Sequence, residues 1–188
     1  MSDLTQRAIK AAFLQLLDAH PLAKITVKDV VEACGLHRNS FYYHYRDLPD
    51  LLEKIVADDI ARLTEQYTDV DSFEECLRIA VEFTLAHRKA VNHIFHSVNR
   101  DIFERYLWQV CEYVVARYLQ KSFTVYDITE SDRPIIVHFY KCEIFGQVMG
   151  WLDDGMESDI LSVNARLCAL RKGMLEELLR RSAASKKG

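Results

Sequence analysis

Glycine and proline are scarce in this sequence, which has 6 glycines and 3 prolines. Few positions therefore suit tight turns, and no segment shows the alternation of apolar and polar residues that marks a half-buried strand. Both absences favour an all-helical fold. A long hydrophobic run is missing too, and the first residues, MSDLTQRAIKAAF, are amphipathic. Neither export nor membrane insertion is indicated, so we expect a cytoplasmic protein.

Motifs of common catalytic sites are also missing. The sequence has no glycine-rich phosphate loop, no Gly-x-Ser-x-Gly, no HExxH and no paired carboxylates in a plausible cleft. Its five cysteines stand singly, as reduced thiols in a core do. His93 with His96, and His138 with Cys142, leave a metal, pH-switch or redox interpretation open, but no complete ligand set has a recognisable spacing. We predict no catalytic residue, cofactor or metal site, while an active site assembled from distant residues stays an alternative.

Helical periodicity is the main positive signal in this sequence of 188 residues, of which 49% are hydrophobic and 28% charged. Apolar residues recur every three or four positions through most of the chain. The polar stretch over 122–131 predicts a loop, and the small, polar tail over 182–188 is expected to fray. We expect helices over residues 3–19, 27–34, 37–45, 48–67, 72–87, 89–95, 103–118, 132–154 and 159–180.

The stretch ITVKDVVEACGLHRNSFYYHY, residues 25–45, stands apart. Thr26 is a good N-cap, and Asp29 three positions later completes a capping box. Gly35 suits a sharp turn with positive φ. Two short helices joined by such a turn are the signature of a helix-turn-helix. Because the second helix mixes aromatic side chains with Arg38 and Asn39, it suits an anionic, base-lined groove better than a buried core.

This stretch resembles the N-terminal domain of TetR/AcrR-family regulators over residues 8–52. The resemblance implies an all-α fold in which residues 1–47 form a helix-turn-helix DNA-binding domain. Residues 48–188 would form a helical domain for dimerisation and effector binding. Two positions depart from the family pattern: Leu48 replaces a common phosphate-binding lysine, and His37 replaces a common capping serine. The matching positions are Thr26, Gly35, Leu36, Ser40, Phe41, Tyr42, Tyr45 and Leu51.

The second short helix would act as the recognition helix. Arg38 suits guanine and Asn39 suits adenine, because each can form a bidentate pair with that base edge. Phe41 and Tyr45 are better explained as core residues, and packing beneath the helix is also open for the other two tyrosines. The net charge of −4 is no objection, because residues 1–47 carry six Lys/Arg against five Asp/Glu. The predicted DNA-binding residues are Thr26, Lys28, His37, Arg38, Asn39, Ser40, Tyr42, Tyr43, His44 and Arg46.

Dimerisation is predicted from the two C-terminal helices. The helix over 132–154 places apolar residues nearly all round its axis, which indicates burial on more than one side. In a chain of this size a second subunit would supply the second side, although both helices could also be ordinary core. The predicted interface residues are Phe145, Met149, Trp151, Leu152, Leu167, Leu170 and Met174.

Effector binding is implied by the resemblance and is less visible in the residues. Several aromatics and one histidine could line a pocket, although aromatics at helical spacing are more often core. The hypothesis is a homodimeric repressor of a near-palindromic operator, released or modulated by a small molecule. A DNA-binding regulator without an effector and a helical adaptor that binds protein are the alternatives. The predicted pocket residues are Phe83, His87, Phe95, Trp108, Tyr113 and Phe139.

Overall fold

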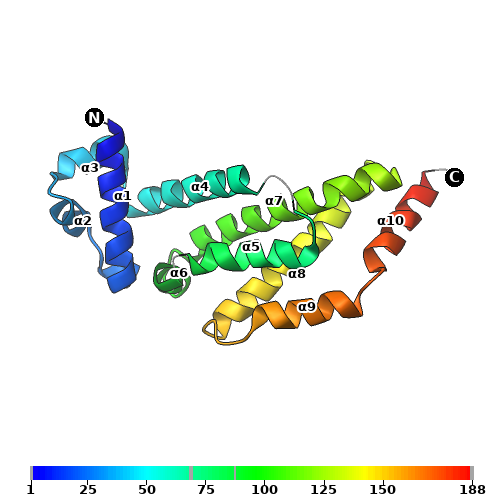
Figure 1. Cartoon of the computed structure of the whole chain (residues 1–188). Helices are drawn as coiled ribbons and strands as arrows, with labels where there is room; N and C mark the ends of the chain where they lie inside the picture. Colours follow the sequence, from blue (N-terminus) through cyan, green and yellow to red (C-terminus); the bar gives the residue numbers. More distant parts are fainter. Residues whose placement is uncertain (1, 68–69, 87, 187–188) are drawn as a thin grey trace. The chain divides into compact units, whose positions relative to one another are not determined.

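The computed structural model describes residues 2–67, 70–86 and 88–186, and within them every regular element is a helix (Figure 1). This confirms the predicted all-α fold. The elements are α1 (Ser2–Ala19), the 3-10 helix η1 (Leu22–Lys24), α2 (Val27–Ala33), α3 (Arg38–His44), α4 (Leu48–Gln66), α5 (Phe73–Leu85), α6 (Arg88–Phe95), α7 (Arg100–Tyr126), α8 (Asp132–Asp153), α9 (Ile160–Leu170) and α10 (Met174–Ser185).

Local signals in the sequence determine several helix ends. Helix α1 ends at Ala19, just before the His20–Pro21 pair that disfavours helix. The carboxylate of Asp47 accepts a hydrogen bond from the Asp50 amide at 2.8 Å and so caps the start of α4. Ser72 caps α5 in the same way, because its hydroxyl accepts from the Glu75 amide at 3.1 Å.

The loop predicted over 122–131 is shorter in the structure. Helix α7 continues to Tyr126, and Asp127, with φ of 47°, is the first residue of the connection to α8. The extension follows from Phe123, which lies four positions after the buried Leu119 and is itself buried. Polar residues such as Ser122 and Thr124 therefore continue a helix that keeps an apolar stripe.

The single helix predicted over 159–180 is two helices. Helix α9 ends at Leu170, and Gly173, with φ of 87°, precedes α10. A left-handed glycine at this point ends one helix and starts the next in a new direction. The tail predicted to fray over 182–188 is also helical through Ser185. The Ser182 hydroxyl there is buried and donates to the Asp132 carboxylate at 2.5 Å.

The described chain forms two compact units. The first consists of Met1–Leu63 with Thr84–Tyr106, and the second of Thr64–Phe83 with Leu107–Gly188. The unit that contains α2 and α3 therefore also holds α6 and the start of α7. The functional boundary at residue 47 stays a prediction.

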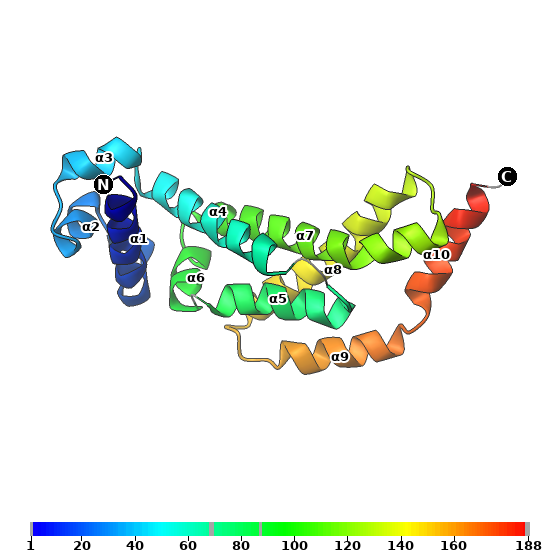
Figure 2. The same ribbon diagram turned by 45° about the horizontal axis from the view of Figure 1, so that its top comes forward.

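In the first unit, α1, α2 and α3 gather around a shared core (Figures 1 and 2). Helix α6 joins this core through His93, whose Nδ1 lies 2.6 Å from the carbonyl oxygen of Leu17 in α1. Arg105 in α7 forms an ion pair of 3.2 Å with Glu53 in α4. Each fully buried apolar side chain contributes about 1.5–3 kcal/mol to folding. The core of this unit includes Ile9, Phe13, Leu17, Val30, Val31, Phe41, Leu51, Leu52 and Ile55.

The second unit is built from parts of α5 and α7 together with α8, α9 and α10 (Figure 2). Its interior holds Lys141, a buried cation whose ammonium donates to Glu112 at 2.7 Å and lies 4.1 Å from the ring centroid of Trp108. No helix within the described ranges combines the length and the hydrophobicity that a membrane span requires. The core of this unit includes Leu77, Val110, Cys111, Val114, Leu119, Ile144 and Val148.

Candidate nucleic-acid interface

Helix α2 is held at its start by the predicted capping box. The Thr26 hydroxyl accepts from the Asp29 amide at 3.3 Å, and the Thr26 amide donates to the Asp29 carboxylate at 2.8 Å. The same hydroxyl also donates to that carboxylate at 2.6 Å. The two bonds that the carboxylate accepts, first from the hydroxyl and then from the amide of Thr26, lower the pKa of Asp29. Because Asp29 keeps the hydroxyl hydrogen of Thr26, a phosphate contact by Thr26 has to compete with the cap.

The turn after α2 places α3. Gly35 has φ of 66°, as predicted, and its amide donates to the Glu32 carbonyl at 3.2 Å. The Leu36 amide donates to the Val31 carbonyl at 2.8 Å, so both bonds close the end of α2. His37 is the N-cap of α3, and its side chain makes no capping hydrogen bond to the described backbone. The replacement of the usual serine therefore removes a side-chain cap from α3.

Helix α3 has one buried face and one exposed face. Phe41 and Tyr45 are 0% and 2% exposed, and their ring centroids lie 5.5 Å apart. Their prediction as core residues is confirmed. Tyr42 and Tyr43 are 56% and 80% exposed, which excludes the alternative that they pack beneath the helix. The exposed face of α3, which carries Arg38, Asn39, Tyr42 and Tyr43, is called the α3 face below.

The other predicted DNA-binding residues lie around this face or at the start of α2. Ser40 and His44 are half-buried, and the ring of His44 meets that of Tyr43 edge to face at 4.8 Å. Lys28 lies 3.6 Å from Glu32 in an exposed ion pair, so its ammonium stays accessible. The remaining members, Thr26, His37 and Arg46, are exposed.

Two residues that sequence reasoning missed anchor the C-terminal end of α3 to α4. The Lys54 ammonium donates to the His44 carbonyl at 2.8 Å, and it lies 5.0 Å from the ring centroid of Tyr45. The Asp50 carboxylate accepts from the Arg46 amide at 2.9 Å and pairs with Lys54 at 3.3 Å. The Arg46–Asp50–Lys54 spacing of four residues each was the signal available in the sequence.

Asp50 is the electrostatic centre of this anchor. Its side chain is 10% exposed, and its pKa lies below the ordinary value because the Arg46 amide and then the Lys54 and Arg46 side chains hydrogen-bond to it. A carboxylate held in this way stays charged at neutral pH and keeps α3 attached to α4. The arrangement presents Arg38 and Asn39 on a helix whose base is fixed.

The predicted effector residues do not gather in one compact unit. Phe95 is buried in the first unit, where the Arg100 guanidinium lies 3.8 Å from its ring centroid. His87 lies outside the described residues. The other members belong to the second unit, where Phe139 is exposed and the Tyr113 hydroxyl donates to the Tyr67 carbonyl at 3.0 Å. Their role as an effector pocket stays a prediction; the half-buried ones are Phe83, Trp108 and Tyr113.

The predicted dimer residues divide into two groups. Trp151 and Leu152 are buried within the protomer, and the Trp151 indole N–H donates to the Ser158 carbonyl at 3.1 Å. Little of either side chain is left for a partner. Leu167 and Leu170 of α9 and Met174 of α10 are exposed, while Phe145 and Met149 of α8 are half-buried. Ile135, Phe139 and Val163 are exposed and apolar as well, and the predicted interface set does not include them.

Two curated proteins match this chain in sequence. An uncharacterized HTH-type transcriptional regulator of Bacillus subtilis, YxbF, is 25% identical over an alignment of 158 residues that covers 80% of this chain. The HTH-type dhaKLM operon transcriptional activator DhaS of Lactococcus lactis is 26% identical over 82 residues, 44% of this chain. The chain spans 40% and 44% of the lengths of these two relatives.

The fold matches a solved structure over nearly its whole length. The structure of a dihydroxyacetone kinase operon activator DhaS superposes with a TM-score of 0.71 at 18% identity, covering 92% of this chain and 96% of that one. At that identity the match establishes the fold alone.

A family model described as the C-terminal region of transcriptional regulators, of the TetR type, matches residues 71–173, which is more than half of the chain. The match lies outside the helix-turn-helix, so it is independent of the resemblance over residues 8–52. Residues 8–52 and residues 71–173 thus indicate the same family, and the protein belongs to the TetR-type family of transcriptional regulators.

Proposed function

We propose that this protein is a sequence-specific regulator that binds a near-palindromic operator as a homodimer. The observation that carries the proposal is the α3 face. Arg38 and Asn39 lie at the start of a helix whose other side is buried and whose end is tied to α4. A short helix held in this way can enter the major groove of B-DNA with its first residues toward the bases.

The side chains divide by chemistry into base-reading and phosphate-binding groups. Arg38 would read guanine and Asn39 adenine, each at about 1–3 kcal/mol of discrimination. Tyr43, the most exposed ring of α3, would stack on a sugar or contact a thymine methyl. The groups that flank them would bind phosphates and set the register. These are Thr26, Lys28, His37, Ser40, Tyr42, His44 and Arg46.

The proposal requires a dimer because one short helix contacts too few base pairs to select a site. Exposed apolar side chains lie on one face of α8, at Ile135 and Phe139, and on one face of α9, at Val163, Leu167 and Leu170. Such faces suit an isologous contact between two copies, which would present two α3 helices to half-sites about 34–36 Å apart or a multiple of that distance.

Repression is the proposed mode of control, because a dimer that occupies an operator can exclude polymerase by volume alone. Activation is the second candidate, since relatives in both sequence and fold are named as activators. Residues 48–188 would hold a small-molecule effector that shifts operator affinity. A tenfold shift requires about 1.4 kcal/mol of coupling. Binding of duplex DNA also implies a cytoplasmic location and a regulatory function in place of catalysis.

Selection of bound sequences from random duplexes tests this function most directly. We expect a near-palindrome with two equal half-sites, and an affinity that falls steeply with salt as phosphate contacts are screened. Enrichment of a single half-site would contradict the dimer. Absence of any duplex binding at low ionic strength would contradict the function as a whole. A promoter–reporter fusion that carries the selected site then separates repression from activation by the sign of the response.

A further inference from the structure

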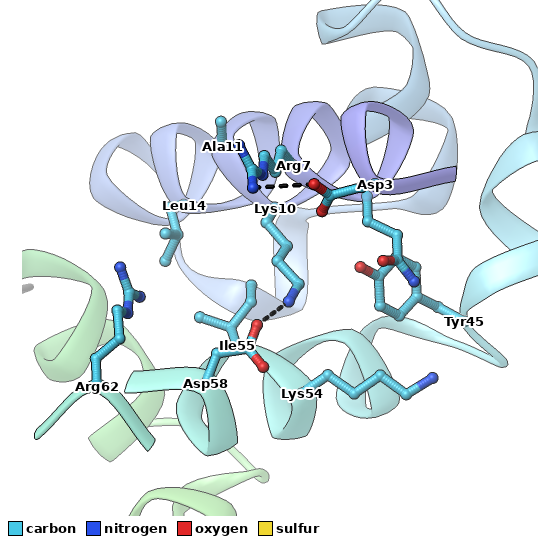
Figure 3. Close-up of a pocket in the computed structure, with 11 residues that line it drawn as sticks. Asp3, Arg7, Lys10, Ala11, Leu14, Tyr45, Lys54, Ile55, Asp58 and Arg62 are labelled. Atoms are coloured by element: carbon cyan, nitrogen blue, oxygen red, sulfur yellow. Dashed lines mark hydrogen bonds and ion pairs between the residues drawn. The ribbon is translucent and has the colours of Figure 1, made fainter. Parts of the chain in front are cut away.

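A cavity of about 820 Å³ lies within the first unit, between α1, the end of α3 and α4 (Figure 3). It includes none of the residues that the sequence suggests for effector binding. Its position is notable because Tyr45, the residue that ends α3, forms part of its wall. A molecule bound here would contact α1, α4 and the residue that ends α3, all of which support the α3 face.

The hydroxyl of Tyr45 is the first indication that the cavity binds a ligand. Tyr45 is 2% exposed, and its hydroxyl has no hydrogen-bond partner among the residues that the structure describes. Figure 3 shows this hydroxyl turned toward the side of the cavity where Lys10 lies. Buried hydroxyls are normally paired, so one aimed into a cavity calls for a partner inside it. Burial, with smaller effects of Asp58 and Asp50, raises the pKa of Tyr45 to about 12, and the group therefore remains an O–H donor at neutral pH.

The wall offers more donors than acceptors. Lys10 pairs with Asp58, and Arg7 pairs with Asp3 at 2.9 Å, so both carboxylates of the wall are already engaged. An ammonium has three N–H donors and a guanidinium has five, which leaves several of them available on Lys10 and Arg7. The Asp58 side chain is 56% exposed and can remain turned to solvent when Lys10 gains a second partner.

The charged side chains of the wall are also mostly hydrogen-bond donors. Four cations line the cavity, namely Arg7, Lys10, Lys54 and Arg62, against two carboxylates. Arg62 pairs with Asp59 at the edge, and the ammonium of Lys54 is engaged by the carbonyl of His44 and by the Asp50 carboxylate at 3.3 Å. Lys10 is the best placed cation, because its side chain is only 24% exposed and lies in the centre of the cavity in Figure 3. The N–H donors that remain on Lys10 and Arg7 favour a ligand with several acceptor atoms, and an oxyanion forms the strongest hydrogen bonds with such donors.

Apart from the carboxamide of Gln6, the remaining wall is apolar. Ala11 and Leu14 of α1 and Ile55 of α4 contribute aliphatic surface, and Tyr45 contributes its ring. The volume falls in the range of about 300–1,000 Å³ that is typical of small-molecule sites, and it is far larger than a bare inorganic ion needs. We propose that this cavity binds a small organic anion, a carboxylate or phosphate monoester with an apolar body, whose oxyanion meets Lys10 and the Tyr45 hydroxyl.

Titration calorimetry with 2-naphthoate on the full chain tests the proposal without reference to DNA. We expect saturable binding at one site per chain, with 2-naphthamide and inorganic phosphate each at least roughly tenfold weaker, because one lacks the charge and the other lacks the apolar body. Naphthyl phosphate serves as a second probe. Whichever of the two anions binds more tightly identifies the preferred oxyanion.

Two variants test whether 2-naphthoate binds in this cavity. Tyr45→Phe removes only the hydroxyl, and Lys10→Met removes the ammonium but keeps the aliphatic stem. Each should weaken 2-naphthoate by roughly tenfold, since a hydrogen bond or ion pair to an anion is lost. The controls are Tyr126→Phe in the second unit and Lys89→Met, an exposed cation of α6, and both should leave the affinity unchanged.

Thermal melts show whether each variant is folded, and Tyr45→Phe should melt no lower than wild type because the hydroxyl it loses has no described partner. Three results would overturn the site. These are absence of saturable 2-naphthoate binding up to millimolar concentration, equal affinity for 2-naphthamide, and undiminished affinity in a folded Tyr45→Phe variant. None of them bears on operator binding, so failure of this site would leave the proposed function intact.

Discussion

Two surfaces of this protein leave large side chains in water, and they differ in kind. The α3 face combines a guanidinium, a carboxamide and two tyrosine rings that carry hydroxyls. The exposed faces of α8 and α9 carry Ile135, Phe139, Val163, Leu167 and Leu170, which have no polar atom in their side chains. The first surface can form hydrogen bonds with an anionic, hydrated partner. The second can only exclude water, and therefore fits another apolar surface.

This difference separates two kinds of specificity. Contacts of the α3 face depend on direction, because a bidentate Arg or Asn pair forms with one base edge and not with another. Contacts of the α8 and α9 faces depend on shape, and each copy of the chain carries the same shape. Changes to the first surface should therefore alter which DNA is bound, whereas changes to the second should alter whether a dimer exists.

The largest effect is expected from Leu170→Glu on α9. Leu170 is 68% exposed in the protomer, so a carboxylate there leaves the fold intact. In a twofold interface two such charges would be buried without partners, at about 3–5 kcal/mol for each uncompensated charge. We expect the dimer dissociation constant to rise at least about 100-fold, measured by sedimentation velocity.

Val125→Glu provides the matched control for Leu170→Glu. Val125 is 78% exposed at the end of α7, and it is absent from the α8 and α9 faces. This variant should remain as dimeric as wild type. Equal dimerisation of the Leu170→Glu variant would show that the partner does not cover this part of α9.

The next effect is the loss of base discrimination in Arg38→Ala. The affinity ratio between the selected operator and one with the contacted guanine replaced should fall by roughly 10–100-fold, which corresponds to about 1–3 kcal/mol. Fluorescence anisotropy with the two duplexes measures this ratio. Arg180→Ala removes an exposed cation of α10 and should leave the ratio unchanged. An Arg38→Ala variant that keeps the full ratio would remove Arg38 from base recognition.

Sequence reasoning predicted the helix-turn-helix well because its signals are local. The capping box of Thr26 and the positive φ of Gly35 each depend on residues within three or four positions. The break at Gly173 was missed because one glycine in a helix costs only about 1 kcal/mol, so an unbroken helix remains plausible. The burial of Trp151 and the unpaired hydroxyl of Tyr45 depend on which helices pack together, and periodicity carries no such information.

The anchor between α3 and α4 gives a smaller, pH-dependent effect. Asp50→Asn removes the charge that holds the Arg46 amide and Lys54, and we expect a loss of about 1–3 kcal/mol in the free energy of unfolding. Because the folded pKa of Asp50 lies below the ordinary 3.8, its contribution is present at neutral pH. It is lost as the pH falls from that value through the lower folded pKa.

Urea melts between neutral pH and about pH 3 measure this difference. The stability gap between wild type and Asp50→Asn should be largest at neutral pH and should narrow in acid. A difference in unfolding free energy that stays constant with pH would mean that Asp50→Asn destabilises the protein through packing instead of charge.

The smallest effect concerns Thr26, which both caps α2 and is proposed to contact phosphate. Thr26→Ala removes the cap, at about 1 kcal/mol of stability, whereas Thr26→Ser keeps a hydroxyl that can accept from the Asp29 amide. Because the hydroxyl hydrogen is donated to the Asp29 carboxylate, we expect the alanine variant to lose more stability than operator affinity. Thermal melts and anisotropy well below the melting temperature measure the two losses. An affinity loss in Thr26→Ala that exceeds its stability loss, and that Thr26→Ser restores, would show that the phosphate contact outweighs the cap.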